Sequence, residues 1–191
     1  RIKRRLRVID FSLDKLNRQK WLTVNLGKNY MPDVHIVDRY LQTVHLFDVQ
    51  DDGKGLDFFI PEGDEVALHT LPEGFREGYY ALTVGAGHYT KQMPAEDLSR
   101  LVAMINKPVV LLGSTSESAK AEEIKQALPE KAMNACGQLS INQSASVVRQ
   151  ARFVIAHDTG MMHVASAFGK NIISLWGNTI PEFGMYPYRP G

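Results

Sequence analysis

The chain has 191 residues and a nearly balanced charge, with 22 basic and 21 acidic side chains. Its composition, 44% hydrophobic and 23% charged, is that of an ordinary globular protein, which disfavours the disordered, collagen-like and disulfide-scaffold classes. The single cysteine, Cys136, cannot form an internal disulfide, and no apolar run approaches the ~20 residues of a membrane-spanning helix. We therefore expect about one and a half domains with a substantial core.

Residues 1–20 are strongly basic, with eight basic and two acidic side chains. Such a segment can bind nucleic acid, an anionic membrane face or a phosphorylated acceptor, or it can be an ordinary solvated surface. No initiator Met precedes it, and the chain stops at the turn-like Pro190 and Gly191. We expect the chain to be a piece of a longer protein.

The region before residue 78 has irregular patterns. Residues 35–47 place Ile36, Tyr40 and Val44 at helical spacing, and residues 56–60 (LDFFI) are typical of a strand. Residues 61–78 are rich in Pro, Gly and acidic side chains, a composition typical of a linker. We predict a domain boundary near residue 75, with residues 1–75 and 76–191 on either side of it.

From Gly78 onward, strand patterns alternate with helix patterns. Strands are expected over 79–84, 108–112, 133–136, 153–156 and 172–176, with helices between them starting near Pro94, Ser116, Ser140 and Gly160. The strands are apolar on both faces, as in a parallel sheet covered by helices on each side. The sequence therefore predicts a Rossmann-like, doubly wound α/β domain.

Ligands of such sheets bind beyond the carboxyl ends of the strands. The first strand is followed by Gly85-Ala86-Gly87-His88-Tyr89-Thr90-Lys91, which suits a phosphate with a cation beside it. A dinucleotide fingerprint is disfavoured because Thr90 replaces its third glycine and no acidic residue ends the next strand. The ordinary alternative is that Lys91 is an exposed lysine at the start of a helix.

Asp158, Thr159 and Gly160 follow the fourth strand and begin a helix. Gly160 would expose amides to a diphosphate, and Asp158 would bind hydroxyls of an attached sugar, although both Asp158 and Thr159 are also ordinary N-caps. His163 lies one turn further, where a packing role is the plain alternative. A metal site of His157, Asp158 and His163 is disfavoured, because adjacent strand-end residues point to opposite faces.

Three motifs in this order resemble glycosyltransferase family 9, the ADP-heptose:lipopolysaccharide heptosyltransferases. Residues 158–170 (DTGMMHVASAFGK), followed by 174–179 (SLWGNT), resemble the family signature. Residues 85–94 (GAGHYTKQMP) resemble its Thr-Lys-x-Trp-Pro segment, and residues 113–117 its Gly-x-x-x-Glu turn. Met93 stands where the family usually has Trp, and Asn178 where it often has Pro.

The resemblance implies a GT-B fold of two Rossmann-like domains. Residues 1–75 would be the last part of an acceptor-side domain, and residues 76–191 a donor-binding domain truncated at its C-terminus. It also implies one set of donor-binding residues. Lys91, beside Thr90, would contact the donor phosphate or sugar, Glu117 the ribose hydroxyls, Asp158 the sugar hydroxyls, and Thr159 and Gly160 the diphosphate, with His163 supporting their loop.

The implied enzyme transfers heptose from ADP-heptose to a glycolipid or oligosaccharide of the lipopolysaccharide type, with inversion, and needs no metal at the diphosphate and no cofactor. Its general base is expected upstream of this chain, since Asp10 does not follow a Gly-rich strand end. Cytoplasmic localisation is implied, with peripheral contact to the inner membrane through residues 1–20 and no binding of nucleic acid. The alternatives are a UDP-sugar transferase or epimerase of the same fold, and a non-catalytic nucleotide-sugar binding module.

Overall fold

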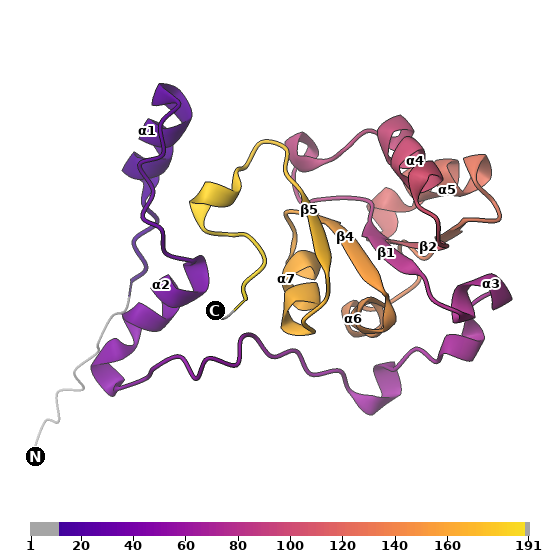
Figure 1. Cartoon of the computed structure of the whole chain (residues 1–191), viewed down its shortest axis with the longest axis horizontal. Coiled ribbons are helices and arrows are strands. Elements are labelled where there is room, and N and C mark those ends of the chain that lie inside the picture. Colours follow the sequence, from indigo (N-terminus) through magenta and orange to yellow (C-terminus); the bar gives the residue numbers. More distant parts are fainter. Residues whose placement is uncertain (1–11, 190–191) are drawn as a thin grey trace, which may run out of the picture.

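The computed structural model describes residues 12–189, and its centre is a five-stranded parallel sheet in the order β3-β2-β1-β4-β5 (Figure 1). Helices connect successive strands, and the strand order runs outward from β1 in both directions, as in doubly wound folds. This confirms the predicted α/β class. The strands are β1 (Tyr80–Thr83), β2 (Val109–Leu112), β3 (Ala132–Asn134), β4 (Phe153–His157) and β5 (Ile172–Leu175).

Two pairs of helices cover the two faces of the sheet (Figure 1). On one face, α4 (Ala95–Met104) and α5 (Ser118–Ala127) pack on alternate side chains of the central strands. On the other face, α6 (Ile141–Gln150) and α7 (Gly160–Ala167) pack on the remaining ones. The central strands are therefore buried on both sides, which is why their sequences are apolar throughout.

Of two N-cap residues predicted from the sequence, one is confirmed and one is wrong. Ser140 caps α6 through its hydroxyl, which accepts from the amide of Gln143, as predicted. The predicted cap Ser116 is wrong, because Ser114 caps a 3-10 turn (Thr115–Glu117) that precedes α5. Glu117 completes this capping box from the third position.

The strand predicted over residues 56–60 is wrong. These residues have an extended backbone but no neighbouring strand, so they belong to no sheet in the described structure. Burial alternates along them, since Leu56, Phe58 and Ile60 are partly buried while Asp57 and Phe59 are exposed. Phe58, for example, packs edge-on against Phe168 just after α7, with 5.9 Å between the ring centroids.

The acidic, glycine-containing segment after Pro61 packs against the sheet domain instead of extending as a free linker. The amide of Val66 donates to the Ser146 hydroxyl on α6, and Leu71 and Phe75 are buried in the core beneath α6 and α7. A short helix, α3 (Glu73–Arg76), ends the segment. The division of the chain into two domains near residue 75 stays a prediction.

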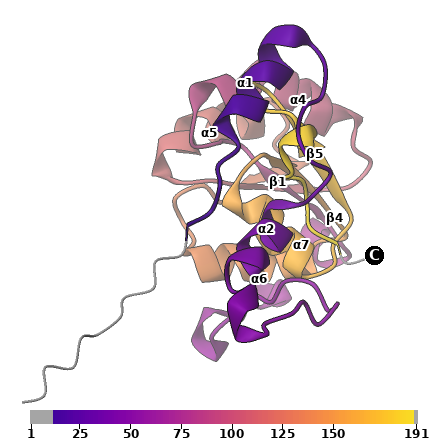
Figure 2. The same ribbon diagram turned by 90° about the vertical axis from the view of Figure 1, so that its left-hand side faces the viewer.

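Two further helices, α1 (Asn17–Leu26) and α2 (Ile36–Thr43), lie beside the C-terminal segment (Figures 1 and 2). The His35 ring caps α2 and also bonds the carbonyl of Tyr186, at 2.7 Å. The amide of Ile36 donates to the carbonyl of Gly184. The start of α2 is therefore bonded to the C-terminal segment. Within residues 12–189, no helix has the length and apolarity to span a bilayer.

Candidate functional site

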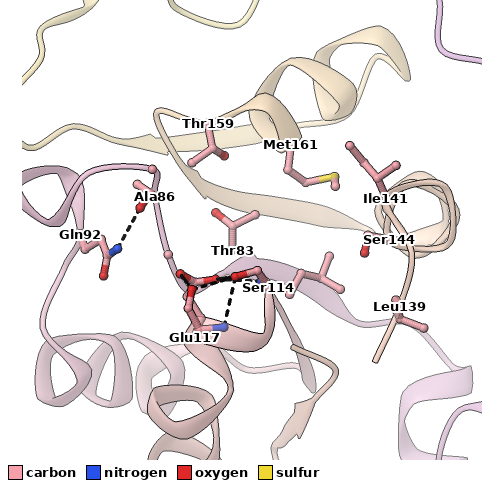
Figure 3. A pocket seen from close by; sticks show the side chains of 15 residues that line it. Thr83, Ala86, Gln92, Ser114, Glu117, Leu139, Ile141, Ser144, Thr159 and Met161 are labelled. Atoms are coloured by element: carbon pink, nitrogen blue, oxygen red, sulfur yellow. Dashed lines mark hydrogen bonds between the residues drawn. The ribbon is translucent and has the colours of Figure 1, made fainter. Parts of the chain in front are cut away.

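A cavity of about 640 Å³ lies at the carboxyl ends of β1, β2 and β4 (Figure 3). One side is formed by the loops after β1 and β2, residues 85–87 and 113–117. The other side is an apolar wall from α6, α7 and the loop before α6, formed by Leu139, Ile141 and Met161. Its volume and its mixture of apolar wall and polar loops are typical of small-molecule sites.

Glu117 presents an ionised carboxylate to this cavity. It accepts from the amide and the hydroxyl of Ser114, at 2.8 and 2.6 Å, and from the hydroxyl of Ser116, at 2.7 Å. Burial acts to raise the pKa of Glu117, but these hydrogen bonds together hold that pKa below its ordinary value. A Cβ atom at Gly85 would lie 2.3 Å from Cγ of Glu117, so a side chain at position 85 would displace the Glu117 side chain.

Lys91 and Asp158 form an ion pair beside the cavity. The ammonium group lies 2.6 Å from Oδ2 of Asp158, and the two side chains are 20% and 8% exposed. The Thr179 hydroxyl donates to the same oxygen, at 2.8 Å. The loop after β1, the end of β4 and the loop after β5 therefore converge on one carboxylate.

His157 fixes the loop that carries Lys91. Its ring lies between the carbonyl of Thr83, 2.9 Å from Nδ1, and the amide of Met93, which donates to Nε2 at 3.0 Å. Burial lowers the pKa of His157 and outweighs the bond to Thr83, so the ring is neutral with its proton on Nδ1. The Lys120 ammonium also donates to the carbonyl of Met93. His157 is thus a positioning residue.

Helix α7 begins at the cavity without a side-chain cap. Thr159 is the N-cap residue, but its hydroxyl does not bond the first amides of the helix. That hydroxyl oxygen is buried and has no hydrogen-bond partner, although Thr159 lines the cavity. Since the first amides of a helix have no partner within it, the amide of Gly160 and its neighbours remain available to an anion.

His163 lies further along α7 and does not line the cavity. Burial lowers the pKa of His163, the nearby His35 lowers it further, and Asp158 opposes both. The ring is therefore mainly neutral at pH 7. Its role in supporting the start of α7 stays a prediction.

The structure brings six of the seven predicted residues to one edge of the sheet, in two groups. Glu117 and Thr159 line the cavity, and Gly160 follows Thr159 at the start of α7. Lys91 and Asp158 form the pair next to it, and the carbonyl of Thr90 accepts from the amide of Asn178 in the loop after β5. His163 is the seventh residue, one turn into α7.

Sequence reasoning missed several residues that line the cavity. Gln92 lines it and donates to the carbonyl of Ala86, at 2.8 Å, which closes the glycine loop. Ser144 and Leu139 come from α6 and the loop before it. Their only sequence signal is their position after β3, where the third strand end meets the common edge.

Metal ligands are not grouped in the described part of the chain: among residues 12–189, no three His, Cys, Asp or Glu side chains are placed to hold a metal ion. The polar groups at and beside the cavity include the Lys91 ammonium, the carboxylates of Glu117 and Asp158, several hydroxyl groups and backbone amides. Such a set suits a ligand that carries both anionic oxygens and hydroxyl groups.

The family model of "Glycosyltransferase family 9 (heptosyltransferase)" matches residues 8–190. The chain belongs to this family. Lipooligosaccharide heptosyltransferase 2 of Haemophilus influenzae is 31% identical over 100 residues, which are 50% of this chain and 27% of that protein. The three-motif resemblance seen in the sequence is thereby confirmed.

Two solved structures have a similar fold. A family 9 glycosyl transferase from Veillonella parvula matches with a TM-score of 0.69 and 21% identity, over 82% of this chain and 48% of that one. The E. coli ADP-heptose LPS heptosyltransferase II matches with a TM-score of 0.66 and 21% identity, over 82% of this chain and 52% of that one. The chain thus spans about half the length of these two proteins, and its match to the Haemophilus influenzae protein covers 27% of that protein.

Proposed function

We propose that the cavity at the strand ends binds the nucleoside diphosphate part of a nucleotide-sugar donor, ADP-heptose. In the longer protein, this site would serve the transfer of heptose to a lipopolysaccharide-type glycolipid or oligosaccharide. Family membership supports the proposal, and one feature of the site supports it further. The start of α7 opens on the cavity without a side-chain cap, so its first amides can bind an anion, and Asp158 holds the Lys91 ammonium beside them.

Each part of the donor has a matching group in the site. The apolar wall of Ile141 and Met161 suits the face of the adenine ring. The ionised carboxylate of Glu117 suits the ribose hydroxyls, which donate hydrogen bonds. The amides of Thr159 and Gly160 suit the diphosphate, and Asp158 is left to accept from hydroxyls of the sugar.

The proposed reaction is an inverting displacement at the anomeric carbon. The acceptor hydroxyl attacks, the bond to the diphosphate breaks, and negative charge grows on the departing ADP. The start of α7 and the Lys91 ammonium would stabilise that charge without a metal or cofactor. The general base that takes the hydroxyl proton is expected outside this chain. We also propose that the longer protein works on the cytoplasmic side of the inner membrane.

The first test is ligand-induced stabilisation of the purified chain. ADP should raise its melting temperature, with a gain of about 2.7 kcal/mol in the free energy of unfolding at 100 times Kd, and UDP should have little effect. Replacing Lys91 by Ala should weaken ADP binding at least ~10-fold, because one charge-assisted hydrogen bond is lost. The matched control is Lys125→Ala in the last turn of α5, away from the strand carboxyl ends, which should bind ADP normally.

Other outcomes of these experiments would favour one of the alternative functions or contradict the proposed site. Stabilisation by UDP alone would favour the UDP-sugar enzyme over the ADP-heptose enzyme. Stabilisation by neither nucleotide would contradict the proposed site. A longer protein that binds ADP-heptose but transfers no sugar to any lipopolysaccharide-type acceptor would favour the non-catalytic binding module.

A further inference from the structure

Both backbone polar groups of Met93 are bonded to side chains from other elements. Its amide donates to Nε2 of His157 at the end of β4, at 3.0 Å, and its carbonyl accepts from the ammonium group of Lys120 on α5. Met93 follows Lys91 by two residues, in the segment that joins the 3-10 turn Tyr89–Lys91 to α4. The segment that carries Lys91 is therefore held from two sides.

The Lys120 ammonium bonds this carbonyl although the Glu117 carboxylate also acts on it. Lys120 is partly buried and forms no ion pair within residues 12–189. Burial lowers the pKa of Lys120, while the charge of Glu117 raises it and so helps to keep the group an ammonium. A charged donor makes a stronger hydrogen bond than a neutral one. The bond to Met93 is therefore a charge-assisted connection between α5 and the segment of Lys91.

The start of α5 faces both polar parts of the candidate site. Glu117 directly precedes α5 and lines the cavity, and Lys120 lies three residues further along the chain. Under the proposed function, Glu117 meets the ribose and Lys91 meets the diphosphate. A ligand that spans both groups needs them at a fixed separation, within about 0.5 Å of the productive geometry. The bond from Lys120 to Met93 fixes that separation through a single helix.

We propose that Lys120 is a positioning residue of the donor site, which holds the Lys91 ammonium beside the diphosphate by anchoring the carbonyl of Met93. Lys120 acts on the ligand through Lys91, so it serves the diphosphate and not the nucleoside. This inference rests on the proposed function for the identity of the ligand. The anchoring itself can be measured without a ligand.

The first experiment compares Lys120→Met with Lys131→Met in the purified 191-residue chain. Lys131 is the matched control, because its ammonium group also donates to a backbone carbonyl, that of Ala103 near the end of α4, at 2.6 Å. It directly precedes β3, at the edge of the sheet opposite the cavity. Lys120→Met should weaken ADP binding ~5-fold to 10-fold, and Lys131→Met should leave it unchanged.

Three further measurements separate positioning from a general loss of structure. Adenosine, which has no phosphate, should bind Lys120→Met and the unchanged chain equally in an NMR titration. When Lys91→Ala is already present, Lys120→Met should weaken ADP binding by less than ~2-fold more, because its effect passes through Lys91. Lys120→Arg keeps a cationic donor and should recover most of the ADP affinity.

The segment of Lys91 also reports on the bond in the absence of ligand. Hydrogen exchange at the Met93 amide should accelerate several-fold in Lys120→Met, while β1 should exchange as slowly as before. Exchange at Met93 should stay unchanged in Lys131→Met. Acceleration at Met93 in a chain that does not bind ADP would overturn the proposed function and still support the anchoring by Lys120.

Two results would overturn the inference itself. In the first, Lys120→Met binds ADP as tightly as the unchanged chain, or exchange at Met93 stays slow, which would show that His157 alone holds the segment. In the second, adenosine and ADP lose affinity equally, or the losses from Lys120→Met and Lys91→Ala multiply. Lys120 would then stabilise the fold without positioning Lys91.

Discussion

The ion pair of Lys91 and Asp158 should be energetically coupled far more strongly than a surface pair. Breaking it on one side leaves a largely buried charge, because the side chains are only 20% and 8% exposed. A double-mutant cycle with Lys91→Met and Asp158→Asn should give a coupling of about 1–3 kcal/mol in the free energy of unfolding. The same cycle at Lys125 and Glu122, which are about half exposed and 3.6 Å apart, should give about 0.5 kcal/mol or less. Equal couplings would contradict the buried position of the site pair.

Acid should weaken the fold through His157. Its folded pKa lies below the ordinary value, chiefly because of burial, so the unfolded chain binds the proton more readily. The stability from this ring is present above pH ~6.5 and falls as the pH drops below that value, with a slope of at most about 1.4 kcal/mol per pH unit for one group. Urea unfolding between pH 7.5 and 5 measures that slope.

The contribution of His163 to this pH dependence must be separated from that of His157. The pKa of His163 is also lowered, mainly by burial, so His163→Gln should reduce the slope and leave the part due to His157. His157→Gln should instead lower stability at every pH, because the amide of Met93 loses its imidazole acceptor. A slope that is unchanged in both variants would assign the acid sensitivity to other groups.

Residue types at strand ends were predictable, and their partners were not. The sequence places Lys91 and Asp158 at the ends of β1 and β4, and topology then brings these strands together as neighbours. The hydrogen bond from the Met93 amide to the His157 ring has no sequence signal, because the two residues are 64 positions apart and the bond depends on the orientation of the ring. The bonds from Ser114 to Glu117 are local, but the sequence equally allowed Ser116 as the cap.

At the scale of elements, periodicity predicted every strand and helix of the sheet domain to within a few residues. It failed for residues 56–60, because an extended segment that lies on a helix has the same alternation as a strand. The polar composition of the segment after Pro61 also gave no sign that Leu71 and Phe75 are buried. In both places the packing depends on contacts with residues distant in the sequence, which local patterns do not contain.

The loops after β1 and β5 approach so closely at Gly177 that a side chain should not fit between them. A Cβ atom at Gly177 would lie 2.5 Å from the carbonyl oxygen of Thr90 and 2.9 Å from Cα of Lys91. Gly177→Ala should therefore push the loops apart and weaken ADP binding at least several-fold, since one backbone must move. Gly63→Ala, where a Cβ atom would have open space, is the control and should bind normally. Normal binding by Gly177→Ala would show that the loop of Lys91 is not part of the site.

At the scale of the whole molecule, Tyr188 joins the C-terminal segment to α2 and to the loop that follows it. Its hydroxyl lies 2.8 Å from a carboxylate oxygen of Asp38 on α2 and 2.7 Å from one of Asp51. The bond to Asp51 and the bond to Asp38 raise the pKa of Tyr188, so the phenol keeps its proton and remains a donor. The C-terminal segment therefore holds α2 and the following loop against the sheet domain.

Removing that hydroxyl should loosen α2 without disturbing the sheet. Tyr188→Phe should cost about 1–2 kcal/mol, because two carboxylates lose their shared donor. Hydrogen exchange should accelerate in Ile36–Thr43 and stay slow in β1, since the strand is held by its own ladder. Tyr186→Phe is the matched control, because its ring contacts His35 while its hydroxyl makes no hydrogen bond in the described structure. If Tyr188→Phe left exchange in α2 unchanged, the closure would depend on the backbone bond between Ile36 and Gly184 instead.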